Sequence, residues 1–156
     1  MRAHIGAEVA VSDRGERLRP PKYVPHQHPA EPVGLPRLAE SRIGYQNLCR
    51  LITRYKLRES TKAEGAALNT DFAEFHEGLI CLTGGSEGPL AAALATGGYD
   101  AAQQSVERLV HLFGQQNVYV EIQRHFDREE EHRNRAALRI ARSLNLPLLA
   151  TGGVNY

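Results

Sequence analysis

The sequence has few cysteines, almost no net charge and no long hydrophobic run, and each shortage excludes a class of protein. Its only cysteines, Cys49 and Cys81, lie in apolar patterns that favour small buried side chains over a disulfide framework or a redox site. Nineteen basic and 18 acidic residues leave a net charge of +1, so the total charge does not indicate nucleic-acid binding. No run approaches the roughly 18 apolar residues of a transmembrane helix, and the N-terminus lacks a signal-peptide pattern. We therefore expect a cytoplasmic protein without a membrane partner.

Length and composition are those of a single globular domain. The chain has 156 residues, of which 42% are hydrophobic and 24% are charged. A chain of this size buries roughly 70% of its unfolded surface on folding. It therefore needs neither a disulfide nor a structural metal to form a core.

An apolar run, a glycine turn and a helical pattern follow one another between Gly78 and Leu94. The run at 79–82 is too short for a buried helix and predicts a strand covered on both faces. Gly84 and Gly85 end this strand, and Ser86 is a candidate N-cap for the helix that follows. The stretch is therefore predicted to be one βα unit.

Further apolar runs alternate with helical patterns along the rest of the chain. The runs at 118–122 and 146–150 predict two more strands, and amphipathic spacing predicts helices at 44–57, 70–75, 100–113 and 127–144. Acidic residues at the start of the last helix suit its positive terminus, which favours a helix start over a metal-binding cluster. Strands that alternate with helices predict an α/β fold with a parallel sheet.

The N-terminal part combines a short strand with a proline-rich loop. Residues 5–11 predict a strand that contains Glu8, either at an exposed end or edge or held for a ligand. Residues 16–36 predict a loop. Its His26-Gln27-His28 pair has a spacing that can hold zinc, but flanking prolines and the lack of a nearby third ligand favour the loop interpretation.

Two further segments lie between the loop and the central unit. Residues 35–40 predict a short edge strand, because Pro36 has no N–H to donate inside a sheet. Residues 59–69 are polar and predict a second loop.

Four segments, in this order, resemble the PHP (polymerase and histidinol phosphatase) domain of bacterial DNA polymerase III alpha subunits. They are GYQNLCRLIT, GLICLTGGSEGPLAAAL, NVYVEIQRHFDREEEHRNRAAL and LPLLATGGVNY. The segments PHQHPAEP and KAEG are similar to the error-prone branch of that family, which acts in damage-induced mutagenesis and translesion synthesis. The resemblance implies a partial distorted TIM-like β/α barrel with mostly parallel strands. It also implies one PHP-like domain over 1–156, with the family's opening strand and helix expected before Met1.

The resemblance also implies a vestigial metal site. Glu8 matches a glutamate ligand of the metal-binding members, whereas a histidine, a cysteine, an aspartate and a second histidine are replaced by Gly34, Gly85, Gly153 and Asn155. Glycine offers a metal no side chain. We therefore expect no metal, no cofactor and no catalytic residue in this chain.

The function implied is that of a non-catalytic scaffold within an error-prone DNA polymerase. The full-length protein would be a DNA-directed nucleotidyltransferase, partnered by its own remaining domains and reaching DNA only as a whole, while this chain alone would be inactive. Two alternatives stay open. One is a metal-dependent phosphoesterase or 3′-5′ exonuclease, and the other is an unrelated α/β interaction module that binds an anion at a Thr-Gly-Gly turn.

Overall fold

A computed structural model describes residues 5–11, 33–58, 66–125 and 128–152. The strands are β1 (Ile5–Val11), β2 (Val33–Ala39), β3 (Leu79–Leu82), β4 (Val118–Gln123) and β5 (Leu148–Thr151). The helices are α1 (Arg42–Arg58), α2 (Asn69–Phe75), α3 (Pro89–Phe113) and α4 (Arg128–Ser143), with a 3-10 turn, Gln115–Asn117, before β4. The mixture of helices and strands expected from the sequence is therefore confirmed.

The five strands form one mixed sheet in the order β1-β2-β3-β4-β5. β3, β4 and β5 are parallel, but β2 runs antiparallel to both β1 and β3. The prediction of mostly parallel strands is therefore met only in the second half, and the described strands do not establish a barrel. Antiparallel neighbours, unlike parallel ones, need no crossover connection, so the alternation of strands and helices in the sequence did not constrain the direction of β2.

β2 is an internal strand, so the prediction of an edge strand at 35–40 is wrong. Pro36 pairs with Glu8 of β1 but lies just beyond Arg37–Cys81, the last pair that β2 makes with β3. The position at which Pro36 lacks an N–H therefore lies beyond the paired residues of β2 and β3. A proline is tolerated inside a sheet at such a position because no hydrogen bond is lost.

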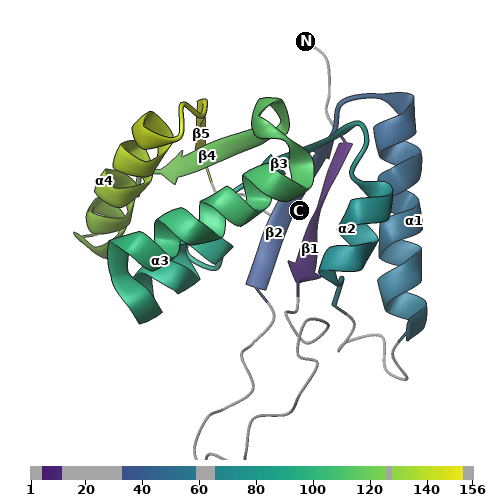
Figure 1. Cartoon of the computed structure of the whole chain (residues 1–156), viewed down its shortest axis with the longest axis horizontal. Helices are drawn as coiled ribbons and strands as arrows, with labels where there is room; N and C mark the ends of the chain where they lie inside the picture. The colour runs from purple at the N-terminus through teal and green to yellow at the C-terminus, as the bar shows by residue number, and fades with distance from the viewer. Residues whose placement is uncertain (1–4, 12–32, 59–65, 126–127, 153–156) are drawn as a thin grey trace, which may run out of the picture.

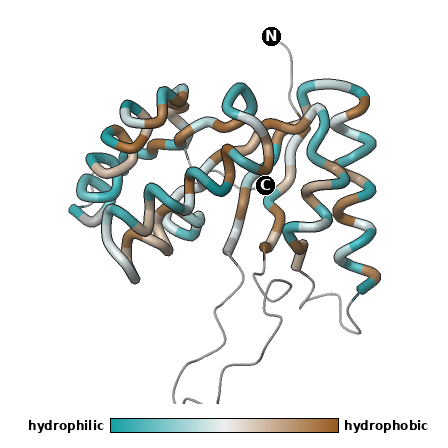
Figure 2. Tube along the Cα trace, in the orientation of Figure 1, coloured by the Kyte–Doolittle hydropathy of each residue, from teal (hydrophilic) through white to brown (hydrophobic). Residues whose placement is uncertain are grey.

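The helices divide into two pairs, each beside one half of the sheet (Figure 1). α1 and α2 stand near β1 and β2, whereas α3 and α4 lie near β3, β4 and β5. Alternate strand residues face the common core, and these include Leu79 and Cys81 of β3 and Val118 and Val120 of β4. Hydropathy alternates along the helices (Figure 2), as expected for elements that each cover one side of the sheet.

α1 buries the predicted stripe but not the predicted cysteine. Leu48, Leu51 and Tyr55 are buried and Ile52 is partly buried, which confirms the amphipathic reading. Cys49 is exposed, so its prediction as a buried residue is wrong, whereas Cys81 is buried as expected. Neighbouring helix positions lie about 100° apart, so a residue next to the buried stripe turns toward solvent.

The central βα unit begins as predicted, with β3 at Leu79–Leu82, but the start of its helix differs. Gly88, not Ser86, is the N-cap of α3, because Pro89 at the first helical position favours an extended preceding residue. The helical patterns predicted separately, up to Leu94 and at 100–113, are joined in α3 by a kink, where Gly98 has φ 71° and ψ −161°. That backbone conformation is open to glycine and strained for other residues.

The two predicted loops are shorter than expected. Loop 16–36 gives way to β2 at Val33, and loop 59–69 gives way to an isolated bridge, in which the Ala67 N–H donates to the Ala10 carbonyl at 2.7 Å. Their remaining parts, 16–32 and 59–65, lie outside the described residues. Within the described part of the chain, no helix has the length and apolarity needed to cross a membrane.

A fully buried arginine lies in the core between the sheet and the helices. Arg37 of β2 is 0% exposed, and its guanidinium carbon lies 4.8 Å and 4.1 Å from the ring centres of Phe72 and Phe113. Its Nη1 donates to the Cys81 Sγ at 2.8 Å, while its Nε and Nη2 have no hydrogen-bond partner. Burial lowers the pKa of Arg37 and raises the pKa of the Cys81 thiol.

Candidate functional site

Glu8 and Gly34 lie side by side on β1 and β2. A Cβ placed on Gly34 would be 1.9 Å from Glu8 Oε1 and 3.0 Å from Glu8 Cδ. The Glu8 carboxyl group therefore occupies the space that a side chain at position 34 would need. A histidine there would require Glu8 to move, so the glycine and the glutamate position are sterically coupled.

Gly84 and Gly85 follow the carboxyl end of β3 and lie at the same end of the sheet as Gly34. A Cβ on Gly84 would lie 3.4 Å from the Gly34 carbonyl oxygen, and one on Gly85 would lie 2.5 Å from Gln123 Nε2. The chain of contacts from Glu8 to Gly34 and on to Gly84 places Gly85 just beyond the carboxyl end of β3, on the side of the sheet where Glu8 lies. The other predicted site residues, His26, His28, Gly153 and Asn155, lie outside the described residues.

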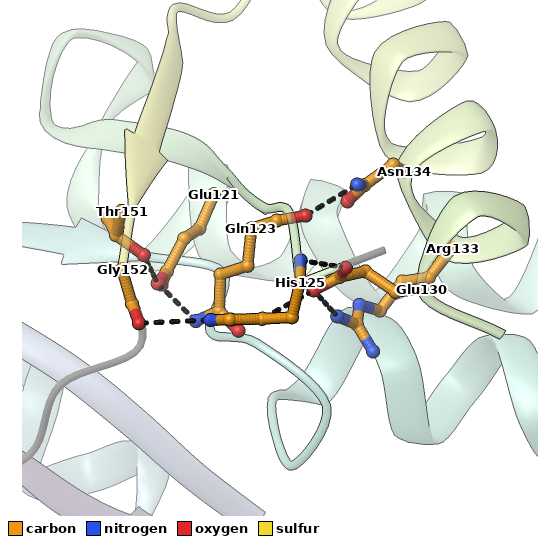
Figure 3. Close-up of polar contacts among 8 residues, drawn as sticks. All are labelled: Glu121, Gln123, His125, Glu130, Arg133, Asn134, Thr151 and Gly152. Carbon is orange, nitrogen blue, oxygen red and sulfur yellow. Dashed lines mark hydrogen bonds and ion pairs between the residues drawn. The ribbon is translucent and has the colours of Figure 1, made fainter. Parts of the chain in front are cut away.

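Glu121 of β4 forms the buried centre of a polar network at this edge (Figure 3). Its side chain is 8% exposed, and its Oε1 accepts hydrogen bonds from Gln123 Nε2 at 2.8 Å and from the Thr151 hydroxyl of β5. Its backbone N–H donates to Thr83 Oγ1 at 2.9 Å, which links the end of β3 to β4. The second carboxylate oxygen, Oε2, is buried without a hydrogen-bond partner.

His125 bridges the end of β5 and the start of α4 (Figure 3). Its Nδ1 lies 2.8 Å from Glu130 Oε1, its Nε2 lies 3.2 Å from the Gly152 carbonyl oxygen, and its backbone N–H donates to Glu130 Oε2. Both ring nitrogens face acceptors, and only the imidazolium form can donate to both. The hydrogen bond with Glu130 is accordingly the main cause of a raised His125 pKa.

Glu130 is held in place from several sides. It is 5% exposed, and the hydrogen bond from the His125 N–H is the main cause of its lowered pKa. Arg133 Nη2 lies 3.6 Å from its Oε1, and the nearby Asn134 Nδ2 donates to the Gln123 carbonyl at 2.6 Å. These contacts fasten the first turns of α4 to the end of β4.

The donors present do not fit a hydrolytic metal centre. Such a centre needs several converging carboxylate, imidazole or thiolate ligands with an open position for water. Among the described residues, no group of three or more His, Cys, Asp and Glu side chains is placed to hold a metal ion. The Glu121 carboxylate is instead tied to an amide and a hydroxyl, and Glu130 is tied to His125. The arrangement joins strand ends rather than exposing reactive groups.

The sequence interpretation missed this network. Glu121 is a carboxylate within an apolar strand, the signal that singled out Glu8, yet 118–122 was taken only as an apolar run. Glu130 lies in a helix start, where acidic residues are common, so its burial against His125 had no sequence signal. Thr151 and Gly152 lie in the segment LPLLATGGVNY, whose resemblance singled out only Gly153 and Asn155.

Comparison with known proteins shows the family to which this chain belongs. The profile of the PHP domain family matches residues 1–125, and this chain belongs to that family. It is 33% identical to the DNA polymerase III subunit alpha of Vibrio cholerae over 122 residues and 33% identical to the error-prone DNA polymerase of Pseudomonas fluorescens over 120 residues. Each match covers 76% of this chain. The error-prone DNA polymerase of Mycolicibacterium paratuberculosis is 28% identical over 168 residues and covers 100% of this chain.

These matches confirm the resemblance to the polymerase PHP domains. The chain spans about a tenth of the length of the Vibrio and Pseudomonas relatives, since each alignment covers 10% of the relative. The relatives are thus much larger proteins with other regions beyond the matched one. The Vibrio DNA polymerase III subunit alpha and the Pseudomonas error-prone DNA polymerase are equally identical to this chain, so identity alone does not decide between them.

Proposed function

We propose that this chain is the PHP-domain part of an error-prone DNA polymerase III alpha subunit and acts as one non-catalytic scaffold domain for the polymerase domains. The branch rests on the segments PHQHPAEP and KAEG, which resemble error-prone members. DNA synthesis in damage-induced mutagenesis, translesion synthesis and repair would belong to the other domains of the full-length enzyme.

The observation that carries the non-catalytic part is the filling of the matched ligand positions. Gly34 and Gly85 supply no donor atoms, and the space beside them is taken by Glu8 and Gln123. Most polar groups at the carboxyl ends of these strands bond to one another, such as Glu121 Oε1 with Gln123 and Thr151 and Glu130 with His125. This arrangement supports a structural role for the edge, joining β3, β4, β5 and α4.

The proposal is tested by measuring metal content and hydrolysis on the purified full chain. We expect no stoichiometric zinc, manganese or iron, and no hydrolysis of a phosphomonoester or of labelled DNA 3′ ends, in the parent and in Glu8→Gln alike. About one metal ion per chain that is lost in Glu8→Gln would instead support a phosphoesterase or exonuclease. A His26→Ala/His28→Ala variant is the matched control, because metal lost only there would place the ions in the loop.

The scaffold part needs a separate test. The full chain and the remaining domains of the polymerase, produced together, should copurify, and synthesis by the assembly should be unchanged by Glu8→Gln. If the chain does not associate with those domains, the scaffold role is wrong, whatever the metal content.

A further inference from the structure

The exposed face of α4 carries a row of basic side chains. They recur at intervals of three and four residues, and all are exposed: Arg128, His132, Arg135, Arg139 and Arg142. At 3.6 residues per turn these positions fall within an arc of about 80° around the helix axis. The row runs for roughly 21 Å, since each residue rises 1.5 Å.

Two carboxylates of α4, Glu130 and Glu131, do little to neutralise this row. Glu130 is turned inward and bonded to His125, and Glu131 makes one exposed ion pair, 3.5 Å from Arg135 Nε. Exposed pairs of this kind contribute little energy and are screened by salt. Within the described part of the chain, Arg128 and Arg142 make no ion pair.

A comparison with α1 shows that this arrangement is not a general property of the arginine-rich helices here. Arg54 of α1 is paired with Glu74 through two hydrogen bonds, and Arg58 is paired with Asp71 at 2.6 Å. Both carboxylates come from α2, the neighbouring helix. These two arginines of α1 are thus partly neutralised within the domain, whereas the basic side chains of the α4 row are exposed.

One member of the row is held in place by an aromatic ring. The Arg139 guanidinium carbon lies 4.2 Å from the centre of the Tyr99 ring of α3. This contact orients the cation before any partner binds. It also covers a face of Tyr99, which is then not open for stacking by an unpaired base.

We propose that this basic row of α4 is a docking surface for the phosphate backbone of duplex DNA. Arginine forks suit phosphate oxygens, and a row of roughly 21 Å laid along a duplex passes about six base pairs, at about 3.4 Å of rise along the helix axis for each. A bilayer would need a broad apolar face, but Ala137, Ile140 and Ala141 of α4 are buried in the core and its other apolar residues, Ala136 and Leu138, are partly buried. An acidic protein would need an apolar or aromatic anchor, which the row lacks. The inference goes beyond the scaffold role and does not depend on it.

The test is salt-dependent binding of the full chain to a fluorescent duplex of arbitrary sequence, followed by anisotropy. Four arginine contacts predict a plot of log K against log salt with a slope of about −3.6. The variant Arg128→Gln/Arg135→Gln/Arg142→Gln should reduce the slope to about −1 and weaken binding more than tenfold at about 50 mM salt. The matched control, Arg42→Gln/Arg50→Gln/Arg54→Gln on α1, removes the same charge and should keep the slope and the affinity within about twofold.

Several outcomes would overturn the proposal. One is no duplex binding at about 20 mM salt, and another is an equal loss in the α1 control, which would indicate diffuse attraction. Tighter binding to a single strand of the same sequence, to anionic vesicles or to polyglutamate would show that the row serves another partner. Circular dichroism and urea unfolding establish that both triple variants are folded, so a loss of binding reports on the surface.

Discussion

The two halves of the molecule differ in the charged groups that they bury. The half built from β1, β2, α1 and α2 encloses the guanidinium of Arg37 and the carboxylate of Asp71, which pairs with the more exposed Arg58. The half built from β4, α4 and β5 encloses the carboxylates of Glu121 and Glu130 and leaves a row of arginines outside. A net charge of +1 therefore conceals a separation of charge between the inside and the outside of the second half. Total charge alone misses a surface of this kind.

The halves also differ in how the buried charge is compensated. Arg37 has two aromatic rings and a thiol around it but no carboxylate, and two of its nitrogens are unpartnered. Glu130, by contrast, has a histidine and an arginine beside it, and Glu121 has an amide and a hydroxyl. The buried cation, Arg37, is therefore less well compensated than the buried carboxylates of the second half. Substitutions at Arg37 should distinguish the contribution of its packing from that of its charge.

The largest expected effect is at Arg37. Arg37→Ala removes the buried side chain that packs against Phe72 and Phe113 and should lower the free energy of unfolding by about 3 kcal/mol. Arg37→Met keeps much of the volume and removes a poorly compensated buried charge, so it should stay within about 1 kcal/mol of the parent. Urea unfolding of both variants measures this. If Arg37→Met lowers the free energy of unfolding as much as Arg37→Ala does, the contacts of the guanidinium group themselves stabilise the core.

A smaller effect is expected at Asp71, the buried carboxylate of the first half. Asp71 accepts from the N–H of Leu68, the N-cap of α2, at 2.8 Å and from Arg58 at 2.6 Å. Asp71→Asn should lower the free energy of unfolding by about 1–2 kcal/mol at pH 7, because the cap and the charged pair are both weakened. Glu74→Gln, which breaks the exposed Arg54 pair, is the matched control and should cost less.

The cost of Asp71→Asn should also depend on pH. Burial raises the pKa of Asp71, but the hydrogen bonds from Arg58 and Leu68 outweigh it and leave the pKa below its ordinary value. A lowered folded pKa adds stability above the unfolded value of about 3.9 and loses it as pH falls through the folded value. The difference between parent and variant should therefore shrink between pH 7 and about pH 3. A difference that stays constant would mean that the carboxylate charge does not matter.

The sequence predicted well those features that depend on local pattern. The strands at 5–11 and 79–82 agree with the observed bounds, and the predicted helices at 44–57 and 127–144 overlap α1 and α4 over most of their length. Hydrophobic periodicity indicates which residues are buried, and the burial of those residues stabilises these helices and strands. The direction of β2 and its internal position were not predicted, because strand pairing depends on contacts far apart in sequence.

The site was only half predictable for the same reason. Resemblance pointed to Glu8, Gly34 and Gly85, and the structure places these three at one end of the sheet. The network around Glu121 and His125 joins residues about 30 positions apart, such as Glu121 with Thr151, so no local spacing reveals it. The basic residues of α4 can be read from the sequence. That they are exposed and poorly neutralised is evident only from the structure, in which Glu130 is turned inward.

The smallest expected effect concerns the His125–Glu130 pair, the counterpart of Asp71 in the second half. Glu130→Gln removes the carboxylate that is the main cause of the raised His125 pKa, so the pKa should fall, as followed by an NMR titration of the ring protons in the full chain. Glu131→Gln, one residue along α4 and exposed, is the control and should leave the titration unchanged. A raised histidine pKa adds stability that is fully present below about pH 6.5 and is lost as pH rises through the folded value. The stability difference between parent and Glu130→Gln should therefore be larger at pH 6 than at pH 9, and an equal difference would show that the imidazolium does not hold the end of β5 against α4.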